Sequence, residues 1–560
     1  MNEWWRKSVV YQIYPKSFND TTGNGVGDLQ GVIEKLDYLK KLGVDVIWLT
    51  PVYSSPQRDN GYDISDYYSI HGEYGTMEDF EELLEETHKR DMKLIMDLVV
   101  NHSSTEHEWF KQASSSKENQ YRDFYIWKDA VDGQAPNNWI SKFGGSAWKW
   151  DETTEQYYLH LFDETQGDLN WENEEVRKEV YKLMKFWFEK GIDGFRLDVI
   201  NLISKDQDFP NDDGSVGLGD GRKFYTDGPR VHEYLQEMNR EVLSPYQAMT
   251  VGEMSSTTLE HCVKYSHPDR NELSMTFNFH HLKVDYPNGE KWALGEMDFL
   301  ALKQILSKWQ VGMHEGGGWN ALFWCNHDQP RVVSRYGNDG QYHKESAKML
   351  ALVMHMMQGT PYIYQGEEFG MTNPKFETID EYRDVETLNM YEELKEAKLD
   401  ESTIMKIIKQ KSRDNSRTPV QWNAKPNGGF TTGTPWINTA SNYKEINAVE
   451  ALSDPNSIFY FYQKLVDLRK THDIITFGDY QLIHVDHKQV FAYVRQWQDE
   501  KAVVLANFYE QPVTIDLPDW VSKEDAKVLL SNYEQLSKPG QEITLRPYEA
   551  VVYHVQTSSS

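Results

Sequence analysis

The amino-acid sequence predicts an α/β fold: a (β/α)8 TIM barrel with a small domain inserted after the third strand and a C-terminal antiparallel β-sandwich. Three observations predict it. Short apolar runs alternate with helical patterns, one interval between runs is very long, and only strand patterns follow His472. Strands that alternate with helices form parallel βαβ units, and eight such units close into a barrel. The active site of such a barrel lies at the carboxyl ends of its strands.

Eight apolar runs give the expected barrel strands in order. Stretches with the spacing of amphipathic helices lie between them. The expected strands are residues 9–14, 46–50, 94–100, 194–199, 249–253, 273–279, 321–325 and 361–365. The expected helices are residues 32–42, 77–90, 174–190, 228–241, 299–308 and 345–357.

The intervals that break this repeat predict the domain boundaries. Residues 103–171 are rich in Trp, Tyr, Gly and Asn, and we expect them to form the inserted domain. The barrel then comprises residues 1–102 and 172–475, with an excursion over 371–447 after the eighth strand. Period-two alternation predicts that residues 476–557 form the β-sandwich.

Charge and cysteine content exclude several classes of protein. The net charge of −30 argues against binding to nucleic acids or anionic membranes, which are polyanions. Cys262 and Cys325 show no zinc-site spacing, and two cysteines do not make a disulfide framework. No run approaches the roughly 20 apolar residues of a membrane span. We expect a cytoplasmic monomer that acts on a small molecule.

Ionisable side chains gather where the expected strands end. One aspartate after a strand is more often a helix cap than a catalytic group. Several such residues at one barrel mouth indicate an active site instead. They are Asp97, His102, Arg196, Asp198, Glu253, His327 and Asp328.

These residue types suit cleavage of a glycosidic bond, which needs a carboxylate nucleophile and a carboxylic acid. Asp198 lies two residues after Arg196, so both side chains leave one face of a strand, and the cation favours an ionised Asp198. Glu253 lies in an apolar run, where desolvation raises a carboxyl pKa and suits a general acid. Asp328 is the third carboxylate, expected to bind sugar hydroxyls and stabilise the transition state.

The sequence resembles the α-amylase superfamily, glycoside hydrolase family thirteen, over nearly its whole length. The segments GVDVIWLTPVY, DLVVNH, QGDLNW, GFRLDVI, VGEM, FWCNHD and GTPYIYQGEE match its signature regions, although Gly167 stands where proline is common. The resemblance implies that Asp198 is the nucleophile, Glu253 the acid/base and Asp328 the transition-state stabiliser. It also implies residues that hold the nonreducing-end glucose, namely Asp59, Tyr62, His102, Arg196, His327 and Arg417, with Phe162 and Gln166 as further candidates.

Within the superfamily, the sequence is similar to the oligo-1,6-glucosidase group. Val199, after the expected nucleophile, resembles members that cleave α-1,6 or related linkages. The segment FNFHHLKVDYPNGEKW follows the sixth strand, and composition alone favours an ordinary solvated loop there. It is nevertheless similar to the corresponding segment of phospho-α-(1,1)-glucosidases. That resemblance implies hydrolysis of α,α-trehalose 6-phosphate, with His281, Lys283 and Lys291 on the phosphate and the role of His280 open.

Three alternatives to this reaction stay open. The first is an oligo-1,6-glucosidase that acts on isomaltose. The second is a transglycosylating isomerase of the trehalose synthase or sucrose isomerase type. The third is a noncatalytic binding subunit, like the amylase-like ectodomains of amino-acid transporters.

Two glycine-rich segments have no part in this chemistry. DTTGNGVGD offers oxygen ligands at alternate positions, as calcium loops do: Asp20, Thr22, Asn24, the backbone of Val26, and Asp28. A structural Ca²⁺, a Mg²⁺ or an empty turn are all open, and catalysis is expected to need no cofactor. GLGDGR, residues 217–222, follows polar residues rather than an apolar strand, so we expect a flexible loop and no nucleotide site.

Overall fold

Eight parallel strands form the barrel, which confirms the expected fold class. The computed structural model describes residues 3–557. Its main sheet has the order β13-β12-β11-β5-β2-β1-β15-β14, and a parallel bridge between Thr276 and Asn320 joins the two ends. Each strand overlaps one of the eight apolar runs. The strands are β1 (Val10–Ile13), β2 (Val46–Leu49), β5 (Lys93–Leu98), β11 (Gly194–Leu197), β12 (Met249–Glu253), β13 (Met275–Phe277), β14 (Ala321–Leu322) and β15 (Thr360–Tyr364).

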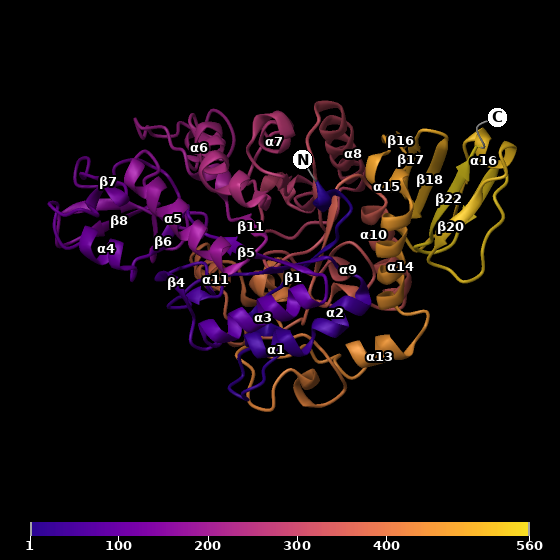
Figure 1. Cartoon of the computed structure of the whole chain (residues 1–560), viewed down its shortest axis with the longest axis horizontal. Helices are drawn as coiled ribbons and strands as arrows, with labels where there is room; N and C mark the ends of the chain where they lie inside the picture. The colour runs from indigo at the N-terminus through magenta and orange to yellow at the C-terminus, as the bar shows by residue number, and fades with distance from the viewer. Residues whose placement is uncertain (1–2, 558–560) are drawn as a thin grey trace.

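Helices surround this sheet (Figure 1). The expected helix over residues 32–42 is two short helices that meet at Lys35, and the expected helix over 299–308 continues to Gly316. In place of one helix over 228–241, α6 passes into a π-helical turn, Asn239–Leu243. The principal helices are α1 (Leu29–Glu34), α2 (Leu36–Leu42), α3 (Met77–Lys89), α5 (Glu174–Lys190), α6 (Val231–Met238), α7 (Leu259–Ser266), α8 (Phe299–Gly316), α10 (His343–His355) and α14 (Ile458–Thr471). No helix among residues 3–557 is long and apolar enough to cross a bilayer.

The inserted segment leaves the barrel and returns to it at one point. β6 (His102–Ser104) pairs antiparallel with β10 (Gln166–Asp168). Between them, β7 (Trp127–Lys128), β8 (Trp148–Asp151) and β9 (Gln156–Leu159) form a small sheet. This lobe lies at the opposite end of the molecule from the C-terminal sheet (Figure 1).

The lobe shares its apolar core with the segment that follows β11. Trp139 and Trp148 of the lobe pack with Val199, Phe209 and Tyr225 of that segment. The segment after β11 is therefore fixed to the lobe as well as to the barrel.

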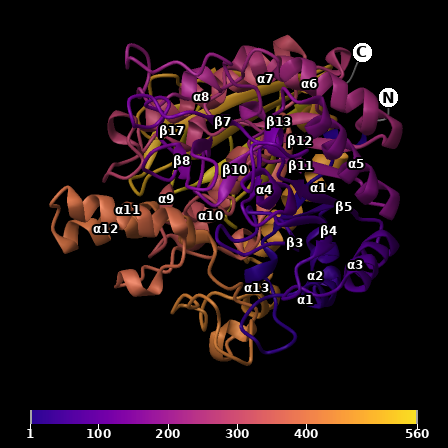
Figure 2. The same cartoon turned by 90° about the vertical axis from the view of Figure 1, so that its left-hand side faces the viewer.

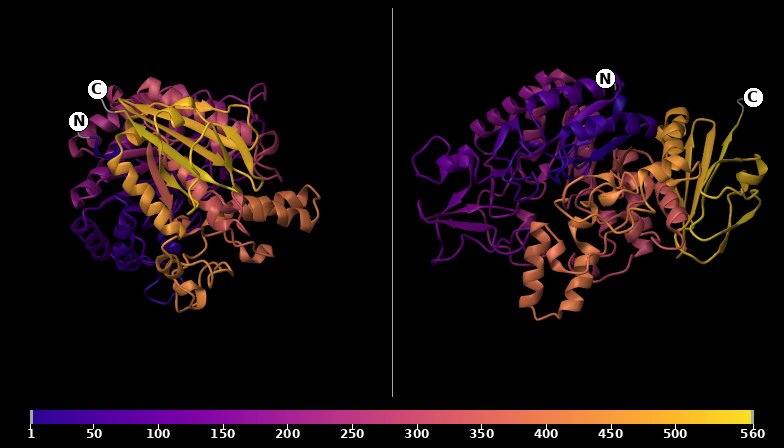
Figure 3. Two further views of the ribbon diagram at one scale, coloured as in Figure 1. Left: turned by 90° about the vertical axis from the view of Figure 1, so that its right-hand side faces the viewer. Right: turned by 90° about the horizontal axis from the view of Figure 1, so that it is seen from below.

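Two further parts complete the chain. In the excursion after β15, α11 (Val385–Glu396) and α12 (Glu401–Lys411) form a projecting hairpin (Figures 2 and 3). The C-terminal part has a five-stranded antiparallel sheet, a two-stranded sheet and a core of its own, as a β-sandwich requires. The expected domain boundaries stay predictions. The C-terminal strands are β16 (Gln481–Ile483), β17 (Val490–Trp497), β18 (Glu500–Asn507), β19 (Val513–Asp516), β20 (Lys527–Ser531), β21 (Glu542–Leu545) and β22 (Ala550–Gln556).

Gly194 lets β11 approach β12 closely enough for the barrel to close at this point. A Cβ at position 194 would lie 1.8 Å from the carbonyl oxygen of Met249, its partner in β12. A side chain here would force the two strands apart.

We therefore expect Gly194→Ala to lower the free energy of unfolding by about 1–3 kcal/mol, as overpacking does. A fall in the midpoint of thermal unfolding measures it. Gly72→Ala is the control, because a Cβ there meets no atom within 4 Å. An unchanged midpoint for Gly194→Ala would contradict the close approach.

Candidate active site

Arg196 binds three carboxylates at the carboxyl ends of three neighbouring strands. Its Nη1 donates to Asp97 Oδ1 at 3.0 Å and to Asp198 Oδ1 at 2.6 Å, and its Nη2 contacts Glu253. Arg196 stands opposite Asp97 in the register of β11 and β5, and Glu253 ends β12. The guanidinium is wholly buried, so the parallel sheet brings these four groups together out of water.

The surroundings of Glu253 suit a general acid. Burial raises its pKa well above the usual value, Arg196 opposes that shift, and Asp198 and Asp328 add to it. The raised pKa favours the protonated form of Glu253, and Asp198 accepts a hydrogen bond from Arg196. A protonated acid beside a carboxylate is the pair that a retaining glycosidase uses.

Asp328 is half-buried, and two neighbouring guanidinium groups favour its ionised form. Arg417 Nη2 lies 2.9 Å and Arg413 Nη1 3.4 Å from its Oδ1, and His327 Nε2 lies 3.3 Å from its Oδ2. Burial alone would raise the pKa of Asp328, but the guanidinium groups of Arg413 and Arg417 lower it below its ordinary value. Burial holds the pKa of His327 well below its usual range, so that ring is neutral and suited to hydrogen bonds.

The other residues expected to hold glucose lie around these carboxylates. The ring of Tyr62 stacks on His327 at 5.1 Å, and its hydroxyl donates to Asp97 Oδ2 at 2.8 Å. His102 Nε2 lies 3.1 Å from the carbonyl oxygen of Tyr62. Phe162 packs against His102 with ring centroids 5.2 Å apart.

Asp59 is fixed from two sides. Gln166 Nε2 donates to its Oδ2 at 3.0 Å, and Arg413 Nη2 donates to its Oδ1 at 2.9 Å. Burial raises the pKa of Asp59 to about 7, and Arg413 and Arg417 limit the rise. The structure thus gathers all of the expected catalytic and glucose-binding residues into one site.

Sequence reasoning missed Arg413 and Asp384. Arg413 reaches Asp59, Asp328 and Asp384, and its contact with Asp384 is 2.5 Å. Arg413 lies in SRDNSR, four residues before Arg417, which was singled out. The repeated arginine in that segment was the available signal.

A cavity of about 530 Å³ opens above the catalytic carboxylates. The inserted lobe, the segment after β11, the segment after β13 and the helix α11 all contribute to its wall. Val199 also lines it and has a φ of +38°, a strained value for a β-branched residue. The lining residues include Lys142, Phe143, Phe162, Val199, Leu218, Arg222, Glu253, Ser256, Lys283, Tyr286, Lys291, Trp292, Asp328, Glu386 and Arg413.

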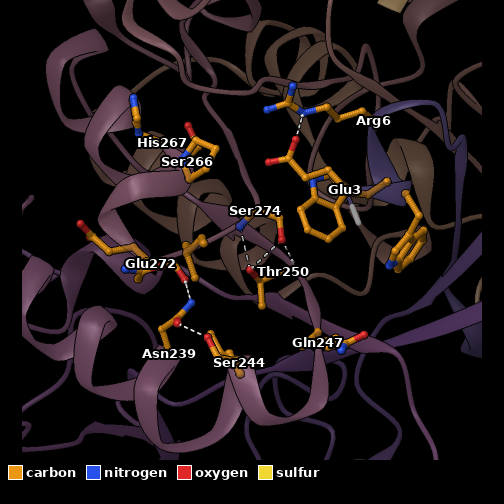
Figure 4. A pocket seen from close by; sticks show the side chains of 17 residues that line it. Glu3, Arg6, Asn239, Ser244, Gln247, Thr250, Ser266, His267, Glu272 and Ser274 are labelled. Carbon is orange, nitrogen blue, oxygen red and sulfur yellow. Dashed lines mark hydrogen bonds and ion pairs between the residues drawn. The ribbon is translucent and has the colours of Figure 1, made fainter. Parts of the chain in front are cut away.

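Another cavity, of about 460 Å³, lies at the amino ends of β12 and β13 (Figure 4). Its polar groups already pair with one another: Arg6 with Glu3 at 2.9 Å, and the Thr250 hydroxyl with the Ser274 amide at 2.9 Å. It lies at the opposite end of β12 from Glu253. The candidate active site is therefore the cavity at the carboxyl ends.

Comparison with known proteins agrees with this geometry. Residues 12–478 match the family model "Alpha amylase, catalytic domain", and residues 490–552 match "Alpha-amylase SusG C-terminal domain". The chain belongs to the α-amylase family, glycoside hydrolase family thirteen.

Three relatives of this glycoside hydrolase match almost its full length. The trehalose-6-phosphate hydrolase of Bacillus subtilis (strain 168) is 67% identical over 99% of this chain and 98% of its own. The oligo-1,6-glucosidase of Bacillus cereus is 55% identical over 99% of this chain and all of its own. The crystal structure of Bacillus licheniformis trehalose-6-phosphate hydrolase has a TM-score of 0.95 and 68% identity, covering 99% of this chain and 100% of that one.

The prediction that His281 contacts a phosphate is wrong. Its Nε2 lies 2.8 Å from the carbonyl oxygen of Phe323, and the side chain is buried outside the catalytic cavity. Burial lowers the pKa of His281 to about 4, which leaves the ring neutral. His280, the residue left open, has its Nε2 2.7 Å from the carbonyl oxygen of Thr257. Both histidines serve to shape the segment after β13.

Lys283 and Lys291 do line the cavity, but they differ in charge compensation. Lys291 forms an ion pair of 2.5 Å with Glu386. Lys283 has no carboxylate partner among the described residues. Burial, together with the neighbouring cations Arg222 and Lys291, lowers the pKa of Lys283 to about 8.

In the loop with calcium-like spacing, side-chain oxygens accept hydrogen bonds from backbone amides of the same loop. Asp20 accepts hydrogen bonds from the backbone of Thr22, Gly23 and Gly25, and Asn24 accepts one from Val26. Asp28 accepts two from Thr21. Both carboxylates are thus engaged in the turn, and they are its only charged oxygen donors. Metal binding here stays a prediction.

Asp198→Asn should lower turnover of an aryl α-glucoside at least about a thousandfold, because the nucleophile is lost. The neutral amide still fits beside Arg196, so the fold is expected to persist. Steady-state kinetics, with thermal unfolding as the control for folding, measure the effect. Activity near the wild-type level would contradict the proposed role of Asp198.

Proposed function

We propose that this enzyme hydrolyses α,α-trehalose 6-phosphate to D-glucose and D-glucose 6-phosphate, with retention at the glucosyl carbon. The observation that carries the proposal is a cluster of cations in the outer part of the catalytic cavity, in a chain whose net charge is −30. The cluster consists of Lys142, Arg222 and Lys283 and is called the basic cluster below.

Lys142 comes from the inserted lobe and has no carboxylate partner among residues 3–557. Burial, together with the neighbouring Arg222, lowers its pKa to about 7. Arg222 follows β11 and pairs with Asp220, with Nη2 2.8 Å from Oδ2. Holding two uncompensated ammonium groups beside a guanidinium is unfavourable unless an anion binds between them. A phosphate monoester is such an anion, and charge-assisted hydrogen bonds would hold it.

The position of the basic cluster matches a phosphorylated leaving group. Asp59, Tyr62 and His102 are buried at the closed end of the site, where an unmodified glucose fits. Lys283 is only half-buried and lies on the segment after β13, toward the open side. The glucose 6-phosphate half would therefore lie in the outer part, next to the basic cluster.

The proposed reaction has two displacements. Asp198 attacks the anomeric carbon of the buried glucose, while Glu253 protonates the oxygen that links the two sugars, and glucose 6-phosphate leaves. Water then attacks the glucosyl–Asp198 ester as Glu253 takes its proton, which releases glucose with its original configuration. Asp328, held ionised by Arg417, binds hydroxyls of the glucosyl ring and stabilises the positive charge that develops on it.

Other properties follow from this proposal. The reaction uses only side chains and water, so no cofactor is needed for the chemistry. A phosphorylated disaccharide formed during uptake would be found in the cytoplasm, which we propose as the location of the enzyme. A monomer and a structural cation at Asp20–Asp28 stay predictions.

Product analysis separates the proposed reaction from its alternatives. With trehalose 6-phosphate, trehalose, isomaltose and sucrose side by side, we expect the highest kcat/KM for trehalose 6-phosphate and equal amounts of glucose and glucose 6-phosphate. The 55% identity to an oligo-1,6-glucosidase makes isomaltose the main competitor. Faster turnover of isomaltose would establish that activity instead. A rearranged disaccharide would indicate an isomerase, and no turnover of any α-glucoside would indicate a binding subunit.

Lys142→Ala and Lys283→Ala should each raise the KM for trehalose 6-phosphate by about tenfold or more, the cost of one charge-assisted hydrogen bond. The KM for an uncharged aryl α-glucoside should change little. In the wild type, the KM for trehalose 6-phosphate should rise above about pH 7–8, as these lysines lose their protons.

Lys149→Ala is the matched control, because Lys149 lies on the same lobe, is exposed and pairs with Glu164. It should behave as the wild type with both substrates. Equal losses on the two substrates for Lys142→Ala and Lys283→Ala would refute the phosphate assignment.

A further inference from the structure

The glycine-rich segment after β11 forms part of the wall of the catalytic cavity. It contains GLGDGR, which the reaction itself does not use. Leu218 lines the same cavity as Glu253 and Asp328, and GLGDGR ends at Arg222 of the basic cluster. The segment therefore connects the rim of the cavity to the basic cluster.

The base of this segment is fixed to the inserted lobe. Asp212 accepts hydrogen bonds at 2.9 Å from the amides of both Gly214 and Gly221, which closes the segment into a loop. Asn138 of the lobe binds the backbone of Asp212 from both sides, at 2.7 Å each. Gly221 lies against Trp139, where a Cβ would lie 2.4 Å from the indole ring.

The tip of the loop, residues 215–219, has no such attachment. Among residues 3–557, no hydrogen bond joins residues 216–219 to any other part of the chain. The glycines at 214, 217 and 219 all have a positive φ, between 70° and 73°, and a Cβ at 214 or 217 would meet no atom within 4 Å. Glycine at such positions gives the backbone more freedom than any other residue.

The tip also exposes two apolar side chains to water. Val216 is 68% and Leu218 57% exposed, among the most exposed large apolar residues of the protein. Of the two, Leu218 lines the catalytic cavity and Val216 does not. Exposed apolar groups on a freely placed loop at the mouth of a site are suited to pack on a bound ligand.

We propose that residues 215–219 are a flap that closes over the leaving sugar, with Leu218 packing on the apolar face of its ring. This inference rests on the proposed function, because the leaving sugar is the one that carries the phosphate. Asp220 and Arg222 link the flap to the basic cluster, so an occupied phosphate site favours the closed position. Closure removes water from the linking oxygen while Glu253 protonates it.

Replacing Leu218 tests the contact. Leu218→Ser should raise the KM for trehalose 6-phosphate by about five- to tenfold. Leu218 is half-exposed, so contact with the sugar buries only part of its side chain, and that part sets the size of the effect. The inhibition constant for glucose, which fills only the buried half of the site, should stay within about twofold, because no contact with Leu218 is lost there. Val216→Ser, on the same tip but outside the cavity, is the matched control and should leave both constants unchanged. Equal changes in both constants for Leu218→Ser, or equal effects of the two variants, would overturn the proposal.

Hydrogen–deuterium exchange tests the closure. In Asp198→Asn enzyme, saturating trehalose 6-phosphate should slow exchange at residues 214–219 at least about tenfold, and glucose should not. The segment 280–291 reports phosphate binding independently of the flap. Slower exchange at 280–291 without any change at 214–219 would overturn the flap alone. No change in either segment would overturn the proposed function, and the flap with it.

Discussion

The buried guanidinium of Arg196 is the interaction on which the active site depends. Three carboxylates converge on it from β5, from β12 and from the residue after β11. Without this cation, their mutual repulsion and loss of hydration would exceed what the surrounding barrel can offset; removing one partner of a buried ion pair costs about 3–5 kcal/mol. The same cation donates a hydrogen bond to Asp198 and opposes the rise that burial causes in the pKa of Glu253.

Charge compensation divides the cavity into two parts. At the closed end, Arg413 and Arg417 form ion pairs with Asp59, Asp328 and Asp384. The inner part therefore offers paired groups that can exchange hydrogen bonds with a neutral sugar. In the outer part, Lys291 is balanced by Glu386, whereas Lys142 and Lys283 have no carboxylate partner among residues 3–557. An anionic ligand supplies the negative charge that the outer part lacks, and a neutral disaccharide supplies none.

The inserted lobe makes this division possible. It brings Lys142 and Phe143 to the cavity, and its core includes Val199 and Phe209 from the segment after β11. One structural unit thus fixes the strained residue after Asp198, one of the three cations of the basic cluster and the base of the glycine-rich loop.

The sequence by itself determined the fold class, the eight strands and the carboxylates. The periodicity of apolar residues, the positions where strands end and the signature segments are all local features of the sequence. It could not determine which distant charges meet. The residue type and sequence position of His281 suggest a phosphate ligand, but its ring is buried against Phe323. Lys142 and Arg222 join Lys283 across 141 residues of chain, from Lys142 to Lys283. Only the tertiary structure decides such cases, because the free energy of a charge depends on its burial and on the neighbours that the fold brings to it.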